Sequence, residues 1–127
     1  FKSMIRDLSL DYPDFLIASS EWFTFVPAKE YFDEPGDHAD ELETSVMMHY
    51  HPELVDLSEA GDGKSKKFAS QMLNEKVAWI PRHWMKVSED TGIGNPKKAS
   101  AEKGKRYVEA VTAKYAQLFK ELTEEIY

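Results

Sequence analysis

The most informative stretch of the sequence is residues 37–50, which read DHADELETSVMMHY. Its apolar side chains recur at the spacing of one helical face. They are Ala39, Leu42, Val46, Met47 and Tyr50. The stretch predicts a helix over about 38–50 that is capped by Asp37. It should stop before Pro52, because a residue that precedes proline avoids the helical conformation.

One carboxylate interrupts the apolar face of this predicted helix. Glu43 falls between Met47 and Tyr50 on the helical wheel, inside the stripe that should be buried. Burial of an unpaired carboxylate costs several kcal/mol, so we expect Glu43 to have a partner. A metal ion would serve, and so would a buried lysine, an arginine or a backbone amide. The sequence leaves these alternatives open.

A histidine, His38, begins the same predicted helix beside the acidic residues Asp37, Asp40 and Glu41. The positive end of the helix dipole favours a neutral imidazole, which suits a general base or a metal ligand. A lone histidine at a helix start is also commonly a surface or capping residue. Both interpretations of His38 stay open.

Helices and short apolar runs alternate along the rest of the sequence. Apolar residues from Phe1 to Leu8 predict a first helix with one buried stripe, ended by a turn around Pro13. We expect strands over 15–19 and 77–81, with an extended aromatic segment over 21–26. This alternation indicates the α/β class, although two or three strands make only half a sheet.

The remaining segments are predicted as loops, turns and one long helix. Loops are expected over 27–36 and 56–67, and a turn over 91–96. The last helix is the clearest element, because apolar residues recur at helical spacing from Tyr107 to Ile126. Its expected cap is Ser100.

Composition and charge restrict the function. The chain has 127 residues, no cysteine and a formal net charge of -7. The negative charge disfavours a nucleic-acid partner, and no apolar run is long enough for a membrane span. We therefore expect a cytoplasmic, globular domain that has no disulfide bonds and binds neither nucleic acid nor membrane. The first helix begins without a cap or an initiator methionine, so we also expect that upstream sequence is missing.

Two motifs in this sequence resemble one known family. Residues 37–45, DHADELETS, followed by PELVD at 52–56, are similar to the D-H-A-G-E-x-E-T-S and P-E-L-V-D signature of the creatininase (creatinine amidohydrolase) family. Residues 91–96, TGIGNP, followed by ASAEKG at 99–104, resemble that family's G-x-x-G-[DN]-P and A-T-A-E-K-G segments. The resemblance covers the C-terminal half of a family member.

The resemblance implies a three-layer α/β/α sandwich around a mostly parallel sheet, of which residues 1–127 supply the C-terminal part of one domain. It implies a metal-dependent amidohydrolase that acts on a small cyclic amide, a formamide or a related C–N bond. The cofactor would be a dinuclear zinc, manganese or iron site, with its other ligands in the missing N-terminal half. The same resemblance implies a homo-oligomer, a hexamer.

Site residues follow from the same match. His38 corresponds to the family's active-site histidine, and Glu43 to a carboxylate that binds a metal ion or orients one of its ligands. Asp37 and Glu41 are candidates for substrate binding or for supporting that site. Two departures are Asp40, which replaces a glycine, and Glu34 with Pro35, which replace a Trp-Asp pair that grips creatinine. Creatinine is therefore not the expected substrate.

Two further interpretations belong beside this one. The alternative function is a non-catalytic acidic interaction or regulatory domain that keeps the fold without the chemistry. Arg82, His83 and the tryptophans Trp79 and Trp84 either wall a pocket or belong to the core or a subunit contact. Lys64 to Lys67 are interpreted as a solvated loop.

Overall fold

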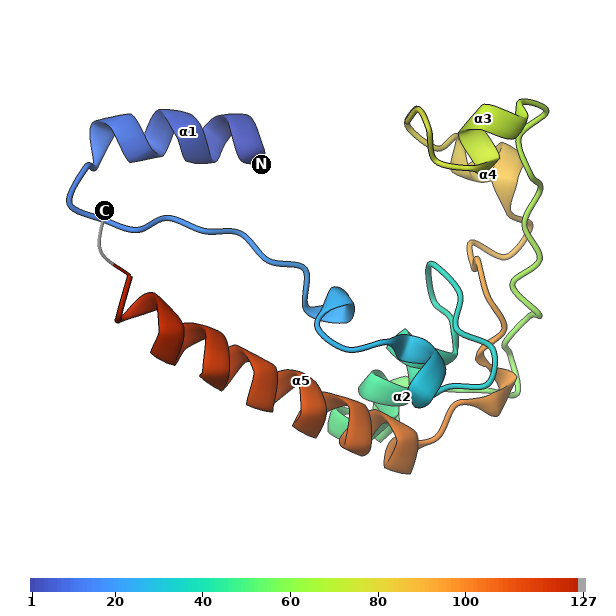
Figure 1. Ribbon diagram of the computed structural model, residues 1–127. Coiled ribbons are helices and arrows are strands. Elements are labelled where there is room, and N and C mark those ends of the chain that lie inside the picture. Colours follow the sequence, from blue (N-terminus) through green and yellow to red (C-terminus); the bar gives the residue numbers. More distant parts are fainter. Residues whose placement is uncertain (126–127) are drawn as a thin grey trace. The chain divides into compact units, whose positions relative to one another are not determined.

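The computed structural model describes residues 1–125 and divides the chain into two compact units (Figure 1). The first unit combines residues 1–26 with the chain from 109 onward, and the second consists of residues 27–108. Among the described residues, no helix combines the length and the hydrophobicity that crossing a bilayer requires.

In the first unit, the two ends of the chain meet through aromatic side chains. Its elements are α1 (Lys2–Asp11), the 3-10 turn η1 (Trp22–Thr24) and most of the long helix α5 (Ala101–Leu122). The rings of Phe25 and Tyr115 stack with centroids 4.2 Å apart, and the Tyr115 hydroxyl lies 2.9 Å from Ser20 Oγ.

Helix α1 forms as predicted, but its apolar face is not buried. No residue of α1 is buried, and Phe1 and Met4 are 93% and 56% exposed. The sequence pattern correctly predicts the helix, because the i, i+3, i+4 spacing is a local property of the chain. Burial needs a second surface, and residues 1–125 do not supply one for this face.

The predicted strands are wrong. Residues 15–19 are irregular, 22–24 form a 3-10 turn, and 77–81 are irregular as well. Within residues 1–125 the backbone ladder is reduced to two isolated antiparallel bridges, His38 with Ile93 and Ser65 with Ser88. An apolar run becomes a strand only when a neighbouring strand satisfies its amide and carbonyl groups, and these runs find none. The parallel sheet is therefore not seen.

The second unit is built around a small core beside the start of α5. The elements between its first loop and α5 are η2 (Ala28–Glu30), α2 (Glu41–Tyr50), η3 (Pro52–Leu54), α3 (Gln71–Asn74), α4 (Trp84–Val87) and η4 (Pro96–Lys98). Tyr107 is fully buried, and its ring contacts Phe32 edge-on at 5.1 Å. Leu42 and Ala99 are also buried.

Helix α2 begins later than predicted. Asp40 caps it, not Asp37: Asp40 Oδ1 accepts from Glu43 N at 2.9 Å and Oδ2 from Gly36 N at 2.5 Å. Ala39 has a φ of 47°, outside the right-handed helical region, so the helix cannot extend back to His38. Of the two acidic candidates, Asp40 is the one whose carboxylate reaches the free amides of the first turn.

The long C-terminal helix is confirmed where the structure describes it. Ser100 Oγ accepts from Lys103 N at 3.3 Å, as expected of the predicted cap, and Glu102 lies in the first turn. The helix ends at Leu122. Ile126, the last residue of the predicted stripe, lies outside the described residues.

Candidate functional site

The two motifs, far apart in the sequence, lie against each other in the second unit. His38 N donates to Ile93 O at 3.1 Å, and Ile93 N donates to His38 O at 2.8 Å. Further along, Ser100 N donates to Ser45 Oγ at 3.1 Å. The structure thus joins residues 37–45 and 91–104 into one region, which we call the two-motif site.

The His38 ring is held at the edge of this site between two side chains. Its Nδ1 lies 3.5 Å from Glu43 Oε2, and its centroid lies 5.0 Å from that of the Trp84 ring. The His38 side chain is 47% exposed. Contact on two sides restricts the ring's orientation, and almost half of the side chain stays accessible to a bound molecule.

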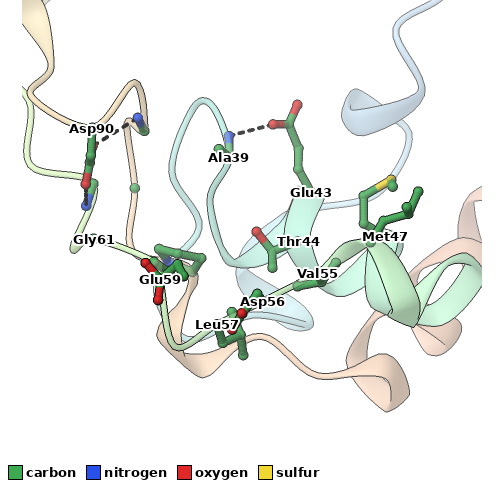
Figure 2. Close-up of a pocket in the computed structure, with 16 residues that line it drawn as sticks. Ala39, Glu43, Thr44, Met47, Val55, Asp56, Leu57, Glu59, Gly61 and Asp90 are labelled. Atoms are coloured by element: carbon green, nitrogen blue, oxygen red, sulfur yellow. Dashed lines mark hydrogen bonds between the residues drawn. The ribbon is translucent and has the colours of Figure 1, made fainter.

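The predicted burial of Glu43 is wrong. Its side chain is 43% exposed, and its Oε2 accepts from Ala39 N at 2.6 Å, as Figure 2 shows. The apolar stripe assumed a helix from residue 38, whereas α2 starts at Glu41, so Glu43 belongs to the first turn and folds back over it. A first-turn carboxylate that accepts a backbone amide is stable without burial or a metal ion.

The buried carboxylate of the two-motif site is Glu41. It has no exposed surface, its Oε1 lies 2.5 Å from Lys103 Nζ, and its Oε2 accepts from Glu34 N at 2.7 Å. Lys103 Nζ also lies 2.8 Å from Asp33 Oδ2. Hydrogen bonds to Asp33 and Glu41 raise the pKa of Lys103 above its ordinary value. The lysine of the second motif thus neutralises the carboxylate of the first.

Asp37 is engaged by a cation from another part of the chain. Its Oδ2 pairs with the guanidinium of Arg82, which also lies 5.4 Å from the centroid of the Trp84 ring. Trp84 in turn contacts His38, so a continuous series of contacts runs from Asp37 through Arg82 and Trp84 to the imidazole. No sequence pattern joins Arg82 to Asp37, since 44 residues lie between them in the chain.

A pocket of about 420 Å³ borders the other side of Glu43. Figure 2 shows that it is formed by α2, by the loop that carries Asp56, Leu57 and Glu59, and by the turn around Asp90. Its wall mixes carboxylates with the apolar side chains of Met47 and Leu57. A molecule in this pocket would lie beside Glu43.

Asp90 organises the turn at the edge of this pocket, a role that the sequence did not reveal. Its carboxylate accepts from Gly63 N at 3.2 Å, from Gly92 N at 3.0 Å and from Ser88 Oγ at 3.1 Å. Gly63 has a φ of 59°, and a Cβ there would lie 1.8 Å from Gly94 O. The backbone approaches too closely for a side chain, which fixes glycine at this position.

The hydrogen bonds to Asp90 predict an acid-sensitive turn. The amide of Gly63, with the Ser88 hydroxyl and the Gly92 amide, holds the pKa of Asp90 below its ordinary value. A lowered pKa stabilises the fold at pH values above the ordinary aspartate pKa of about 3.9. This contribution disappears as the pH falls through the folded-state pKa. We expect Asp90→Asn to reduce stability at pH 7 and to flatten the loss of stability that wild type shows as the pH falls below about 4.

Urea unfolding at several pH values measures this effect. Other carboxylates with a lowered pKa, among them Asp56 and Asp62, also contribute to acid sensitivity, so the quantity of interest is the difference between wild type and the variant. Asp7→Asn, which removes the same charge at an exposed position of α1, serves as the matched control. Parallel acid profiles for wild type and Asp90→Asn would contradict the role given to Asp90.

The described residues supply part of a metal site at most. Within residues 1–125 no three histidine, aspartate or glutamate side chains converge as metal ligands do. His38 and Glu43 come closest, and Glu43 Oε1 has no hydrogen-bond partner among the described residues. One carboxylate oxygen and one imidazole are chemically suited to zinc or manganese, but a complete site needs further ligands.

Known proteins match this chain over the region that holds both motifs. The family model described as "Creatininase: Creatinine amidohydrolase" matches residues 1–119. A crystal structure named "Putative creatinine amidohydrolase", from Bacteroides fragilis, is 62% identical with a TM-score of 0.92. The match covers 99% of this chain and 50% of that chain, so the chain spans half the length of that relative. No curated protein matches.

Proposed function

The chain belongs to the creatininase family, and on that premise we propose that it forms part of a metal-dependent amidohydrolase. The substrate class we propose is a small cyclic amide, a formamide or a related compound with a hydrolysable C–N bond. The observation that supports this proposal is the His38–Glu43 pair, placed where the two family motifs meet and beside a pocket large enough for a small molecule.

Glu43 and His38 have distinct proposed roles. Glu43 would hold a divalent metal ion through its free oxygen, or orient a group that does, while its other oxygen accepts from the Ala39 amide. Such an ion would supply an activated water molecule and would polarise a carbonyl. His38 transfers a proton to or from the reacting molecule, with Glu43 near its Nδ1 and Trp84 limiting its rotation.

The neighbouring carboxylates support these two residues. Glu41 is fully buried and bonded to Lys103 and to the Glu34 amide, so it holds the start of α2 in place. A fully buried carboxylate does not contact substrate directly. Asp37, paired with Arg82, holds the segment that carries His38. Glu34 is bound by Lys98 and Asn95, so it is not free to replace the creatinine-binding pair. This supports a substrate other than creatinine.

We also propose that an N-terminal half completes the domain. The relative is twice as long, and the first unit here leaves apolar surface uncovered, with Leu10 81% and Phe15 69% exposed. Burial of this surface is worth about 25 cal/mol per Å², so a covering half would be strongly stabilised by it. That half would supply the strands next to residues 15–19, the remaining metal ligands and the α/β/α layering. Assembly into a homo-oligomer, a hexamer, is part of the same proposal.

The test is Glu43→Gln in the complete protein, read by metal content and by hydrolysis. Glutamine keeps an acceptor for the Ala39 amide but loses the charge, so we expect folding to persist. Metal affinity should fall by about 10- to 100-fold. Elemental analysis after dialysis measures the bound metal, and a panel of cyclic amides and formamides measures hydrolysis.

A second histidine–glutamate pair provides the control. His51 Nδ1 lies 3.1 Å from Glu53 Oε1, outside the two-motif site, so Glu53→Gln should leave metal content and hydrolysis unchanged. Equal metal content in Glu43→Gln and wild type would refute the role of Glu43. A wild-type protein that binds no metal and hydrolyses nothing in the panel would favour the alternative, a non-catalytic interaction or regulatory domain.

A further inference from the structure

Positive charge is concentrated in two segments of an otherwise acidic chain, residues 64–86 and 97–106, and in the second of them Lys98 and Lys103 are paired with carboxylates. Residues 64–86, which we call the basic segment, hold six of the sixteen basic residues and one of the 23 acidic residues. The segment therefore carries a net charge of about +5, against about -12 for the rest of the chain. Segregation on this scale marks a surface for a negatively charged partner.

The basic segment is an ordered part of the second unit whose two ends lie side by side. Its two ends are joined by the bridge between Ser65 and Ser88 and by a hydrogen bond from Lys66 N to Val87 O at 2.7 Å. Inside it, the Asn74 side chain accepts from Phe68 N and donates to Phe68 O, at 3.0 and 2.8 Å. The backbone is organised by local bonds, so the charges are presented by a defined structure.

Apolar side chains of the basic segment face outward among these charges. Trp79 is 82% exposed, Met85 91% and Val77 70%. A core position for Trp79, one of the alternatives allowed by the sequence, is therefore wrong. Exposed aromatic and methionine side chains are typical of protein interfaces.

A hollow of about 470 Å³ lies within the basic segment and the residues beside it. Leu73 of α3 and Val87 of α4 line it together with Trp79, Lys66 and Lys67, and the paired Asp37 and Arg82 line it as well. Among residues 1–125, Lys64 and Arg82 pair with carboxylates, but Lys66 and Lys67 have no ion-pair partner. The hollow therefore suits an apolar side chain flanked by carboxylates.

The same unit carries a loop of that composition. Residues 52–62, PELVDLSEAGD, which we call the acidic loop, contain four carboxylates and no basic residue. Leu54 is 68% exposed, and the Glu53 side chain is 65% exposed. The acidic loop and the basic segment are complementary in charge, and each presents apolar side chains to solvent.

We infer that the basic segment binds the acidic loop of a second copy of this chain. In a twofold-symmetric pair each copy contributes both surfaces, so the contact forms twice. The inference names the contact surfaces of the self-assembly proposed above and rests on that proposal. It does not depend on the chemistry assigned to His38 and Glu43.

Charge reversal in the full-length protein tests this contact. We expect Lys66→Glu/Lys67→Glu and Glu53→Lys/Glu59→Lys each to weaken self-association at least tenfold, because each sets like charges opposite one another. An equimolar mixture of the two variants should restore association, since both contacts of the mixed pair are then complementary. Sedimentation velocity at low and high salt measures all these species, and wild-type association should weaken with salt.

The control is Lys114→Glu/Lys120→Glu, which changes the net charge equally at exposed positions of α5 and should leave association unchanged. Association of both charge-reversal variants at wild-type strength, or a mixture that stays dissociated, would overturn the inference. So would a monomeric wild type, or binding of the segment only to nucleic acid. Metal content of the Glu43→Gln variant is measured separately, so failure of this contact and failure of the proposed chemistry are distinguishable.

Discussion

Replacement of Lys103 by methionine is expected to lower the free energy of unfolding by about 3–5 kcal/mol. Lys103 is the cation that neutralises Glu41, and the Glu41 side chain is completely buried. Methionine fills a similar volume but leaves the Glu41 carboxylate without a positive partner. Removal of one member of a buried pair costs far more than the pair itself is worth, because the remaining charge stays desolvated. Urea unfolding with linear extrapolation measures the loss.

Two control variants separate this effect from a general loss of charge. Lys103→Arg keeps a cation near Glu41 and should recover most of the stability. Lys98→Met removes the exposed pair with Glu34, in which the two side chains are 50% and 43% exposed, and we expect a cost below about 1 kcal/mol. Equal losses for Lys98→Met and Lys103→Met would show that burial of Glu41 is energetically unimportant.

The double variant Lys103→Met/Glu41→Gln completes a cycle. Glutamine removes the buried charge while its amide can still bond to the Glu34 backbone. We expect the double variant to be more stable than Lys103→Met alone, because the unpaired charge no longer exists. With the single variant Glu41→Gln as the fourth member of the cycle, the difference between the double variant and the sum of the two single variants is the coupling between the two family motifs, measured without knowledge of the substrate.

The comparison of Glu41 with Glu43 shows how far the sequence determines this site. The apolar stripe predicts that Glu43 is buried and needs a partner; a backbone amide, one of the alternatives left open, does bind its carboxylate, but the side chain is not buried. The stripe places the burial on the wrong carboxylate, because α2 starts at Glu41, which leaves Ala39 outside the helix and puts Glu43 in its first turn. The φ of 47° at Ala39, a tertiary feature, sets the true start.

The secondary structure elements also differ in whether local sequence or distant contacts determine them. Ser100 and the apolar spacing of α5 are local, and the helix was predicted within a residue or two of its start. The strands depend on pairing partners, and within residues 1–125 only two isolated bridges form. Arg82 with Asp37 and the turn around Asp90 are likewise contacts between distant residues, which a single sequence does not reveal.

Replacement of Gly104 by alanine is expected to destabilise the protein by about 3 kcal/mol, although alanine is the better helix former. Gly104 lies in α5 against α2, and a Cβ there would be 2.0 Å from Ser45 O and 2.9 Å from Val46 N. Both are backbone atoms, so no rotamer change relieves the clash. The two helices must separate, which lengthens the hydrogen bond from Ser100 N to Ser45 Oγ.

Helix propensity alone predicts that Gly104→Ala stabilises the protein, so the sign of the measured change in stability decides between propensity and the backbone clash. On propensity alone, Gly104→Ala would stabilise α5 by about 1 kcal/mol. The matched variant is Ala113→Gly, at an exposed position of the same helix, where only propensity acts and the expected loss is about 1 kcal/mol. Thermal and urea unfolding of both variants should therefore show two losses, the larger at Gly104. A gain in stability for Gly104→Ala would mean that α2 and α5 do not approach as closely as this site requires, and the union of the two motifs would lose its structural basis.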